Sequence, residues 1–331
     1  MSRLSASVRQ LKAAGDDSRL RLLALLQHGE RTVKDLTEVL GQSQPRISRH
    51  LKLLGDADLV ERLPEGAWVY YRLSEREPGA SLVAAVLTAT AAVDPVLSAD
   101  TERLEQVRWN NQKAADEYFA EHAGDWDRLR QLHGGESAVE AAILDAVGPG
   151  PYRALLDIGT GTGRMLTLLA DRVDRSVGID LSQPMLNVAR ANLERAGINN
   201  ARLRIGDAVR LPVPRDSFDL VIVHQVLHFL DDPARAVAEA AKAVAASGRL
   251  LVIDLAPHDV EALRTEHAHR RLGFSREQVE QWIEAAGLTV TGVSNLKPKA
   301  RLKHALSVTL WSAVDQRIRQ AGGLASGGDP A

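Results

Sequence analysis

Apolar positions in the first 75 residues recur at helical spacing in three short stretches separated by turns. The first stretch covers residues 20–26, and the second covers residues 33–40 and stops at Gly41. The third covers residues 43–54 and carries its apolar stripe at i, i+4 and i+7, on Ile47, Leu51 and Leu54. The pattern predicts three helices, of which the second and third are joined by a glycine turn.

The pattern of apolar and polar residues changes further along the chain. Two β-rich runs, residues 59–63 and 67–73, flank a Pro-Glu-Gly turn and predict a hairpin. Residues from about 76 to 150 are alanine-rich and helical in pattern, with a break at Asp94-Pro95. From Leu155 onward, strand-like runs alternate with helical stretches, which predicts a parallel sheet with crossover helices.

Composition narrows the choice of function. A length of 331 residues favours two domains, and 41 basic against 43 acidic residues leave a net charge of −2, so any DNA contact must come from a local patch. The absence of cysteine excludes disulfides, thiolate zinc sites and cysteine nucleophiles. The first 17 residues lack the apolar core of a signal peptide, and no run approaches the length of a membrane span, so we expect a cytoplasmic protein.

The third predicted helix supplies such a patch, because residues 43–54 contain no acid. A polar, basic helix after a glycine turn is typical of a helix-turn-helix motif, whose recognition helix enters the major groove of double-stranded operator DNA. Arginine and glutamine suit base edges, whereas serine, histidine and lysine suit phosphates. The candidate DNA-binding residues are Gln44, Arg46, Ser48, Arg49, His50 and Lys52, with Arg62 on the hairpin, which would form the wing.

Residues 10–75 resemble the ArsR-type winged-helix repressors, through "DSRLRLLALL", "TVKDLTEVLGQSQPRISRHLKLL" and "GAWVYYRL". The resemblance implies a homodimer on a palindromic operator, with a helix around residues 80–97 in the dimer interface. Metal-sensing members carry cysteines near the position of residues 33–36, or His and Asp pairs on the last helix. This chain has neither, so we expect no metal and a signal that enters elsewhere.

A glycine-rich turn carries the strongest ligand signal. The apolar run 154–158 leads into Gly159, Gly161 and Gly163, where the absence of Cβ atoms permits close approach of a ligand. A second strand, residues 176–180, ends in Asp180, placed where a carboxylate can accept two ribose hydroxyls. The following Ser-Gln-Pro-Met segment, residues 182–185, predicts a capped helix.

The turn is followed by predicted strands that end at Asp207, His224 and Asp254. With these strands, residues 105–315 resemble the class I S-adenosylmethionine-dependent methyltransferases. The two last apolar runs, 288–293 and 306–311, resemble the antiparallel hairpin that closes this fold. The resemblance implies S-adenosylmethionine or S-adenosylhomocysteine as ligand. It places Asp157, Gly159 and Gly161 at the methionine portion, Asp180 at the ribose, Met185 at the adenine, Asp207 at its amino group and His224 on the sulfonium side. The implied binding set is Asp157, Gly159, Thr160, Gly161, Gly163, Asp180, Leu181, Met185, Asp207, Ala208 and His224.

Catalysis has no mandatory signature, since methyl transfer from a sulfonium needs in-line approach and at most a base. His224 and His228 could lie over the transferred methyl group as two general bases, or they could shape the pocket floor and cap a helix. His258, His267 and His269 match no known zinc spacing. Residues 118–127 resemble the helix that covers this pocket in many methyltransferases. Alternatively, the aromatic residues of this segment pack in the core. Arsenite methylation needs thiolates, which the chain lacks.

The predicted fold is thus an α+β winged helix followed by an α/β, doubly wound Rossmann-like sheet with a terminal antiparallel hairpin. The predicted domains are residues 1–75 for DNA binding, 76–104 for dimerisation and linker, 105–315 for the adenosyl ligand, and 316–331 as a flexible tail. Three functions are open, of which the sequence favours the first. The chain could be a regulator that senses the ligand, as in repressors responsive to S-adenosylhomocysteine that control methionine-cycle genes. It could be an active methyltransferase that also regulates its own expression, or a DNA-binding module with a structural second domain.

Overall fold

The computed structural model describes residues 3–65, 68–74, 76–91, 94–123, 136–297 and 306–317. The chain folds into two compact units, and two loops of the C-terminal half belong to the N-terminal unit. The first unit comprises Met1–His122, Leu227–Ala234 and Pro257–Phe274. The second unit comprises Ala123–Val226, Arg235–Ala256 and Ser275–Ala331.

The helices of the first unit begin and end at the polar residues and glycines that mark them in the sequence. Asp16 caps α2 through the backbone N–H of Arg19, and Thr32 and Asp35 form a reciprocal capping box at the start of α3. Gly41, with φ of 62°, ends α3 in the left-handed conformation. The elements are α1 (Arg3–Ala14), α2 (Asp17–Leu26), α3 (Val33–Leu40), α4 (Gln44–Asp56), α5 (Gly79–Ala91), α6 (Pro95–His122), η3 (Leu227–Phe229) and α12 (Ala262–Glu266).

A small antiparallel sheet completes the winged helix. Strands β2 (Val60–Glu65) and β3 (Trp68–Leu73) form the predicted hairpin, and β1 (Arg31–Thr32) pairs with the other edge of β3. The predicted apolar stripe of α4 is fully buried in the core of this unit, with leucines of α2 and α3 around it. Burial of these side chains is the main stabilising term for so short a set of helices.

The described part of the alanine-rich region contains α5, α6 and α8 (Glu136–Val147), and the predicted break at Asp94-Pro95 lies between α5 and α6. Asp100 of α6 is 1% exposed and receives both a 2.6 Å and a 2.7 Å hydrogen bond from Arg21 of α2. The predicted boundary between residues 104 and 105 falls inside α6. In the described part of the chain no single helix is long and apolar enough to cross a membrane; Gly79–Thr90 and Pro95–Asn110 satisfy that criterion only as a bent pair, by length and composition.

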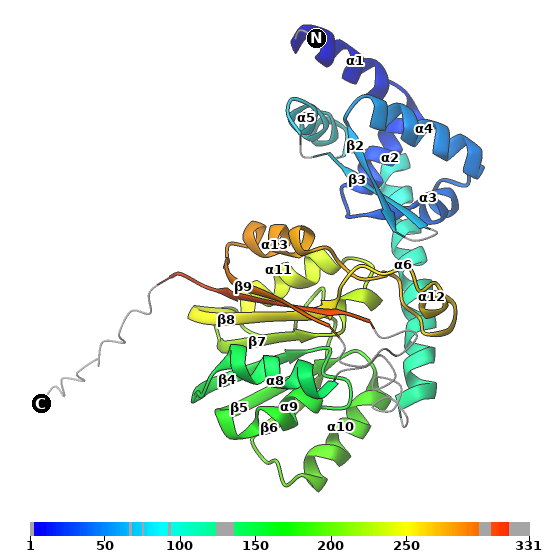
Figure 1. The fold of residues 1–331 in the computed structure, drawn as a ribbon. Coiled ribbons are helices and arrows are strands. Elements are labelled where there is room, and N and C mark those ends of the chain that lie inside the picture. Colours follow the sequence, from blue (N-terminus) through cyan, green and yellow to red (C-terminus); the bar gives the residue numbers. More distant parts are fainter. Residues whose placement is uncertain are drawn as a thin grey trace, which may run out of the picture. The chain divides into compact units, whose positions relative to one another are not determined.

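The second unit is built on a seven-stranded sheet with the order β6-β5-β4-β7-β8-β10-β9. Figure 1 shows β8, β7, β4, β5 and β6 following one another down the sheet. These five strands are parallel, and the last two are antiparallel, which confirms the predicted Rossmann-like sheet with a terminal hairpin. The strands are β4 (Tyr152–Ile158), β5 (Val173–Asp180), β6 (Ala201–Ile205), β7 (Phe218–His224), β8 (Val244–Leu255), β9 (Thr289–Leu296) and β10 (Val308–Val314).

Crossover helices connect the parallel strands. Ser182 caps α10 through the backbone N–H of Met185, as the sequence predicts, and Ser275 caps α13 through that of Gln278. The helices are α8 (Glu136–Val147), α9 (Arg164–Leu168), η2 (Ala170–Arg172), α10 (Gln183–Arg195), α11 (Pro233–Ala243) and α13 (Arg276–Ala285). This arrangement brings the carboxyl ends of β4, β5 and β7 to one edge of the sheet, where ligands bind in open α/β folds.

Candidate functional site

The helix α4 presents most of the predicted DNA-binding residues to solvent. Gln44, Arg46, Arg49 and Lys52 are exposed, and Ser48 is half-buried. Arg62 is exposed on β2 of the hairpin. These side chains lie opposite the buried stripe, so α4 has one apolar face in the core and one basic face available to a polyanion.

His50 is the exception, and its predicted role in phosphate contact is not supported by its position. Its side chain is buried at 4% exposure, together with Ile47, Leu51 and Leu54. His50 lies three residues after Ile47 and four before Leu54, so helical geometry places it on the apolar face. Burial lowers the pKa of its imidazole, and Asp16, 3.8 Å from Nδ1, opposes that shift.

The glycine turn after β4 is held by hydrogen bonds to β4 and to the neighbouring strand β5. The N–H groups of Gly159 and Thr160 both donate to the carbonyl of Ile179 on β5, at 2.8 and 2.9 Å. The hydroxyl of Thr160 donates to Asp157 Oδ2 at 2.6 Å, and Asp157 is 1% exposed. The three glycines of the turn have φ of 69°, 52° and 81°, which side chains with a Cβ rarely adopt. Asp157 therefore stabilises the shape of the turn through its hydrogen bond with Thr160.

Asp180 at the end of β5 is oriented by two backbone amides. Its Oδ2 accepts from the N–H of Gly161 at 2.8 Å, and its Oδ1 accepts from the N–H of Ser182 at 2.9 Å. A carboxylate oxygen can accept more than one hydrogen bond. A half-buried carboxylate held in this way at the end of the second strand suits a pair of adjacent sugar hydroxyls. The residues present thus fit an adenosyl ligand.

The other residues of the predicted ligand set lie at the ends of the same parallel strands or on α10. Met185, Ala208 and His224 are buried, and Leu181 is half-buried. The carboxylate of Asp207 accepts from the N–H of Val209 at 3.0 Å, which orders the turn after β6. The structure does not contradict the predicted binding of ligand by this set, and the binding role stays a prediction.

The two histidines predicted as catalytic candidates fall in different units. His224 ends β7 in the second unit, whereas His228 lies in η3 of the first unit and stacks on His269, with ring centroids 4.3 Å apart. The catalytic role of either histidine stays a prediction. The described residues include no group of three or more His, Asp or Glu side chains arranged to hold a metal ion.

The predicted covering helix is described in part. Tyr118 and Phe119 lie on α6 in the first unit, and the hydroxyl of Tyr118 is 2.8 Å from Nδ1 of His267. Burial raises the pKa of Tyr118. Residues 124–127 of the same prediction, the wing turn at 66–67, and residues 318–331 of the predicted tail lie outside the described residues.

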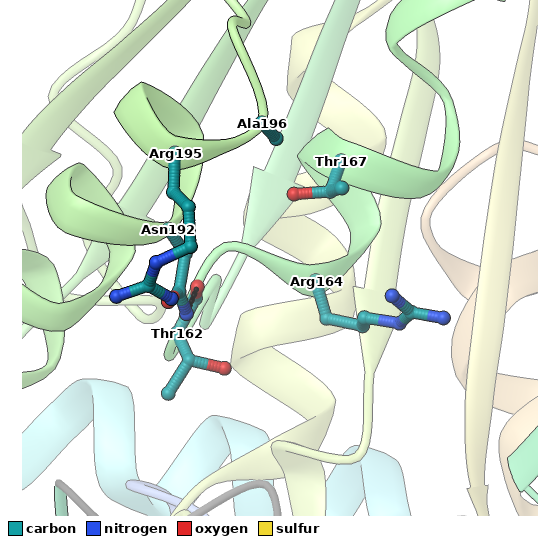
Figure 2. Close-up of a pocket in the computed structure, with 6 residues that line it drawn as sticks. All are labelled: Thr162, Arg164, Thr167, Asn192, Arg195 and Ala196. Atoms are coloured by element: carbon teal, nitrogen blue, oxygen red, sulfur yellow. Dashed lines mark hydrogen bonds between the residues drawn. The ribbon is translucent and has the colours of Figure 1, made fainter.

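A pocket of about 310 Å³ lies beside the glycine turn, between α9 and α10 (Figure 2). Its lining is polar and basic, and consists of Thr162, Arg164, Thr167, Asn192, Arg195 and Ala196. Arg164 is already paired with both carboxylate oxygens of Glu140, and Arg195 with Asn192. None of the predicted adenosyl-binding residues lines this pocket, so it is separate from the predicted ligand site.

Two buried arginines of the first unit are absent from the sequence-based candidates. Arg31 is 1% exposed, donates to the carbonyls of His28 and Glu30, and has a pKa lowered to about 10 by burial. Arg271 is also 1% exposed and pairs with Glu30 at 2.8 Å. No local pattern marks either residue, because their partners are distant in sequence or are backbone atoms.

Comparison with known proteins assigns both halves of the chain. Residues 16–62 match the family "Bacterial regulatory protein, arsR family", and residues 156–252 match "Methyltransferase domain". A stretch of 72 residues, 22% of this chain, is 44% identical to 62% of the arsenical resistance operon repressor of Escherichia coli. A stretch of 106 residues, 32% of this chain, is 35% identical to 42% of the uncharacterized methyltransferase YcgJ of Bacillus subtilis. The chain therefore matches less than two thirds of the length of either relative.

A solved structure supports the fold of the second half. A chain of the Haloferax volcanii complex between the Trm112 methyltransferase activator and a methyltransferase aligns with a TM-score of 0.50 and 19% identity. The alignment covers 60% of this chain and 97% of that one. Together with the two family matches, the helix-turn-helix and the seven-stranded sheet show that this chain joins an ArsR-family helix-turn-helix domain to a class I methyltransferase domain.

Proposed function

We propose that this protein is a DNA-binding transcriptional regulator whose methyltransferase domain senses S-adenosylhomocysteine or S-adenosylmethionine, and that it represses methionine-cycle genes. The observation that carries the proposal is the carboxylate of Asp180, held by two backbone amides at the strand end, in the same chain as a basic recognition helix. A chain with both features can bind an adenosyl ligand and an operator at once. Linkage between the two binding events is then sufficient for regulation.

The DNA-binding half of the proposal rests on the charge distribution of α4. Arg46, Arg49 and Lys52 are exposed on a helix without an acid before Asp56, although the whole chain is slightly acidic. This local patch supports insertion of α4 into the major groove, with Arg62 of the wing near the backbone. The 44% identity to the Escherichia coli repressor over 72 residues supports the same interpretation.

The ligand half rests on the amides and carboxylates of the second unit. Asp180 would hold the ribose hydroxyls, the turn at Gly159 and Gly161 would admit the methionine portion, and Asp207 would meet the adenine amino group. A bound S-adenosylmethionine would supply a transferable methyl group, whereas S-adenosylhomocysteine lacks one. Sensing requires binding alone, so this function needs no acceptor site and no general base.

We further infer a homodimer as the DNA-binding form. Leu4, Val8 and Leu11 recur at i, i+4 and i+7 on α1, and their exposed fractions are 75%, 41% and 52%. An exposed apolar stripe of this spacing suits packing against another helix. Sedimentation should give a dimer for the wild-type chain and a lighter species for Leu11→Glu, whereas a wild-type monomer bound to DNA would contradict the inference.

The sensing function is tested by measuring operator affinity with and without ligand. An operator is first obtained by selecting bound duplexes from a random-sequence library with the full-length chain. Its dissociation constant is then measured at one fixed salt concentration, alone and with saturating S-adenosylhomocysteine or S-adenosylmethionine. We expect a change of about 5- to 150-fold, the usual range for allosteric coupling.

An unchanged affinity with both ligands would refute sensing. The active-methyltransferase alternative predicts conversion of S-adenosylmethionine to S-adenosylhomocysteine when a cell extract supplies acceptors. Such turnover, combined with a ligand-independent operator affinity, would replace the proposed function by that alternative.

A further inference from the structure

Two loops that follow strands of the methyltransferase sheet are built into the DNA-binding unit. The β7 loop, Leu227–Ala234, begins three residues after the last residue of β7, and the β8 loop, Pro257–Phe274, begins two residues after the end of β8. The two strands are neighbours, with His224 opposite Ile253. Each loop is therefore a short covalent continuation of its strand. The end of β7 carries His224 of the predicted ligand set, and the end of β8 pairs beside it.

The β8 loop contacts the wing through a buried arginine. The guanidinium carbon of Arg271 lies 3.6 Å from the ring centroid of Tyr70 on β3, and its Nη1 lies 2.8 Å from Glu30 Oε2. The hydroxyl of Tyr70 donates to the carbonyl of Arg270 at 2.5 Å. Arg271 and Tyr70 are 1% and 2% exposed, so the stacking and the hydrogen bond are shielded from water, where such contacts are strongest.

A second contact in the wing repeats this arrangement. The guanidinium of Arg264, on α12 within the β8 loop, lies 4.7 Å from the ring centroid of Trp68 at the start of β3. Thus two arginines of one loop cover two aromatic rings of one strand, with Trp68 and Tyr70 on the same face of β3.

The two loops are also joined to each other and to α6. The carbonyl of His228 accepts from the N–H groups of Arg270 and Arg271 at 2.9 and 3.0 Å, and Asp231 pairs with Arg270 at 2.5 Å. Phe229 packs edge-on against Phe119 of α6, with centroids 4.8 Å apart. Figure 1 shows α12 beside α6, in agreement with the contact between His267 and Tyr118. The two loops are therefore linked to each other, to α6 and to the wing.

We propose that the β8 loop is the coupling element of this regulator, and that Arg271 stacked on Tyr70 transmits the state of the adenosyl site to the wing. This inference rests on the proposed sensing function. A ligand that shifts the ends of β7 and β8 shifts the start of both loops, and the buried contacts of Arg271 pass that shift to β3. The wing then meets the DNA backbone in a different position. Arg271 and Tyr70 are positioning residues, because they touch the wing and the loop and belong to neither predicted binding set.

The test measures the coupling in variants that retain both binding sites. Arg271→Lys keeps a positive charge for Glu30 but removes the flat guanidinium from Tyr70, and Tyr70→Phe removes only the hydrogen bond to Arg270. In each variant the affinity for S-adenosylhomocysteine without DNA is measured by calorimetry, and the operator affinity is measured with and without saturating ligand. We expect ligand affinity within about twofold of wild type. The ratio of operator affinities should fall by about 2- to 30-fold, the range for residues that carry coupling.

Arg72→Lys is the matched control, because Arg72 also lies on β3 but pairs with Glu61 of β2 at 2.9 Å. It should leave the ratio unchanged. A wild-type ratio of one refutes the sensing function and this coupling together. A wild-type ratio above about five that both variants retain refutes the coupling alone. If Arg271→Lys lowers the folded fraction, Tyr70→Phe decides the question, since it removes a single oxygen atom.

Discussion

Asp180→Asn should weaken adenosyl binding strongly while leaving the fold intact. In the wild-type chain the two carboxylate oxygens accept from the N–H groups of Gly161 and Ser182. A carboxylate oxygen can accept a further hydrogen bond from a ligand hydroxyl. An asparagine offers one carbonyl oxygen as acceptor. Its NH₂ group takes the place of the second oxygen and cannot accept a hydrogen bond from an N–H group or a hydroxyl. The substitution therefore removes the charge and at least one acceptor.

The magnitude follows from the hydrogen bonds at stake. A hydrogen bond to a charged group contributes about 1.5–3 kcal/mol, and two ribose hydroxyls would both lose such a partner. The sum, about 3–6 kcal/mol, corresponds to an affinity reduced by about 10²- to 10⁴-fold. Disruption of one backbone hydrogen bond at Gly161 or Ser182 acts in the same direction, because it loosens the turn that the ligand meets.

Isothermal calorimetry with S-adenosylhomocysteine measures this loss directly. Circular dichroism and a thermal melt of the same sample show whether the fold is retained. Asp174→Asn is the matched control, because Asp174 is an exposed carboxylate on the same strand and lies outside the predicted ligand set. A folded Asp180→Asn protein with affinity within about threefold of wild type would show that the adenosyl site lies elsewhere.

Three further substitutions probe other parts of the argument. Gly159→Ala should lower the free energy of unfolding by about 2–5 kcal/mol in urea titrations, because φ is 69° and a Cβ would lie 2.5 Å from Val226 Cγ2. Arg49→Ala should weaken operator binding and reduce the slope of log affinity against log salt by about one, without changing calorimetric ligand affinity. His50→Phe should remove part of the pH dependence of stability. Burial lowers the folded pKa of His50, so the unfolded chain takes up more protons and wild-type stability falls as pH drops through the ordinary histidine pKa of about 6.5.

Each of these has an outcome that contradicts it. Wild-type stability of Gly159→Ala would mean that the turn relaxes around a methyl group. An unchanged salt slope for Arg49→Ala would place that side chain away from the phosphates. A urea midpoint of His50→Phe that varies between pH 5.5 and 7.5 as much as that of wild type would assign the pH dependence to other groups.

Periodicity predicted most of the backbone. The spacing of Ile47, Leu51 and Leu54 gave the correct buried face of α4, and Gly41 marked the end of α3. The four apolar strands of the parallel sheet and the terminal hairpin were likewise readable, because buried parallel strands are nearly continuous hydrophobic runs. Local patterns predicted local structure well.

The misplaced residue and the missed contacts have different physical causes. His50 was assigned to the polar face by its residue type, although its helical phase places it beside Ile47 and Leu54. Arg271 and Tyr70 are separated by about 200 residues, and no local period relates them. Recruitment of two sheet loops into the other unit depends on tertiary packing, which a single sequence does not display.

The position of β10 inside the sheet has a consequence for synthesis of the chain. Strand β10 pairs with β8 on one side and with β9 on the other, yet it is translated after both. While the ribosome is still making the final strand, β8 presents an unpaired edge to other nascent chains. The helices α1 to α6, in contrast, emerge first and pack against one another within the first unit. Premature termination before Val308 would therefore release a folded winged helix attached to an aggregation-prone sheet.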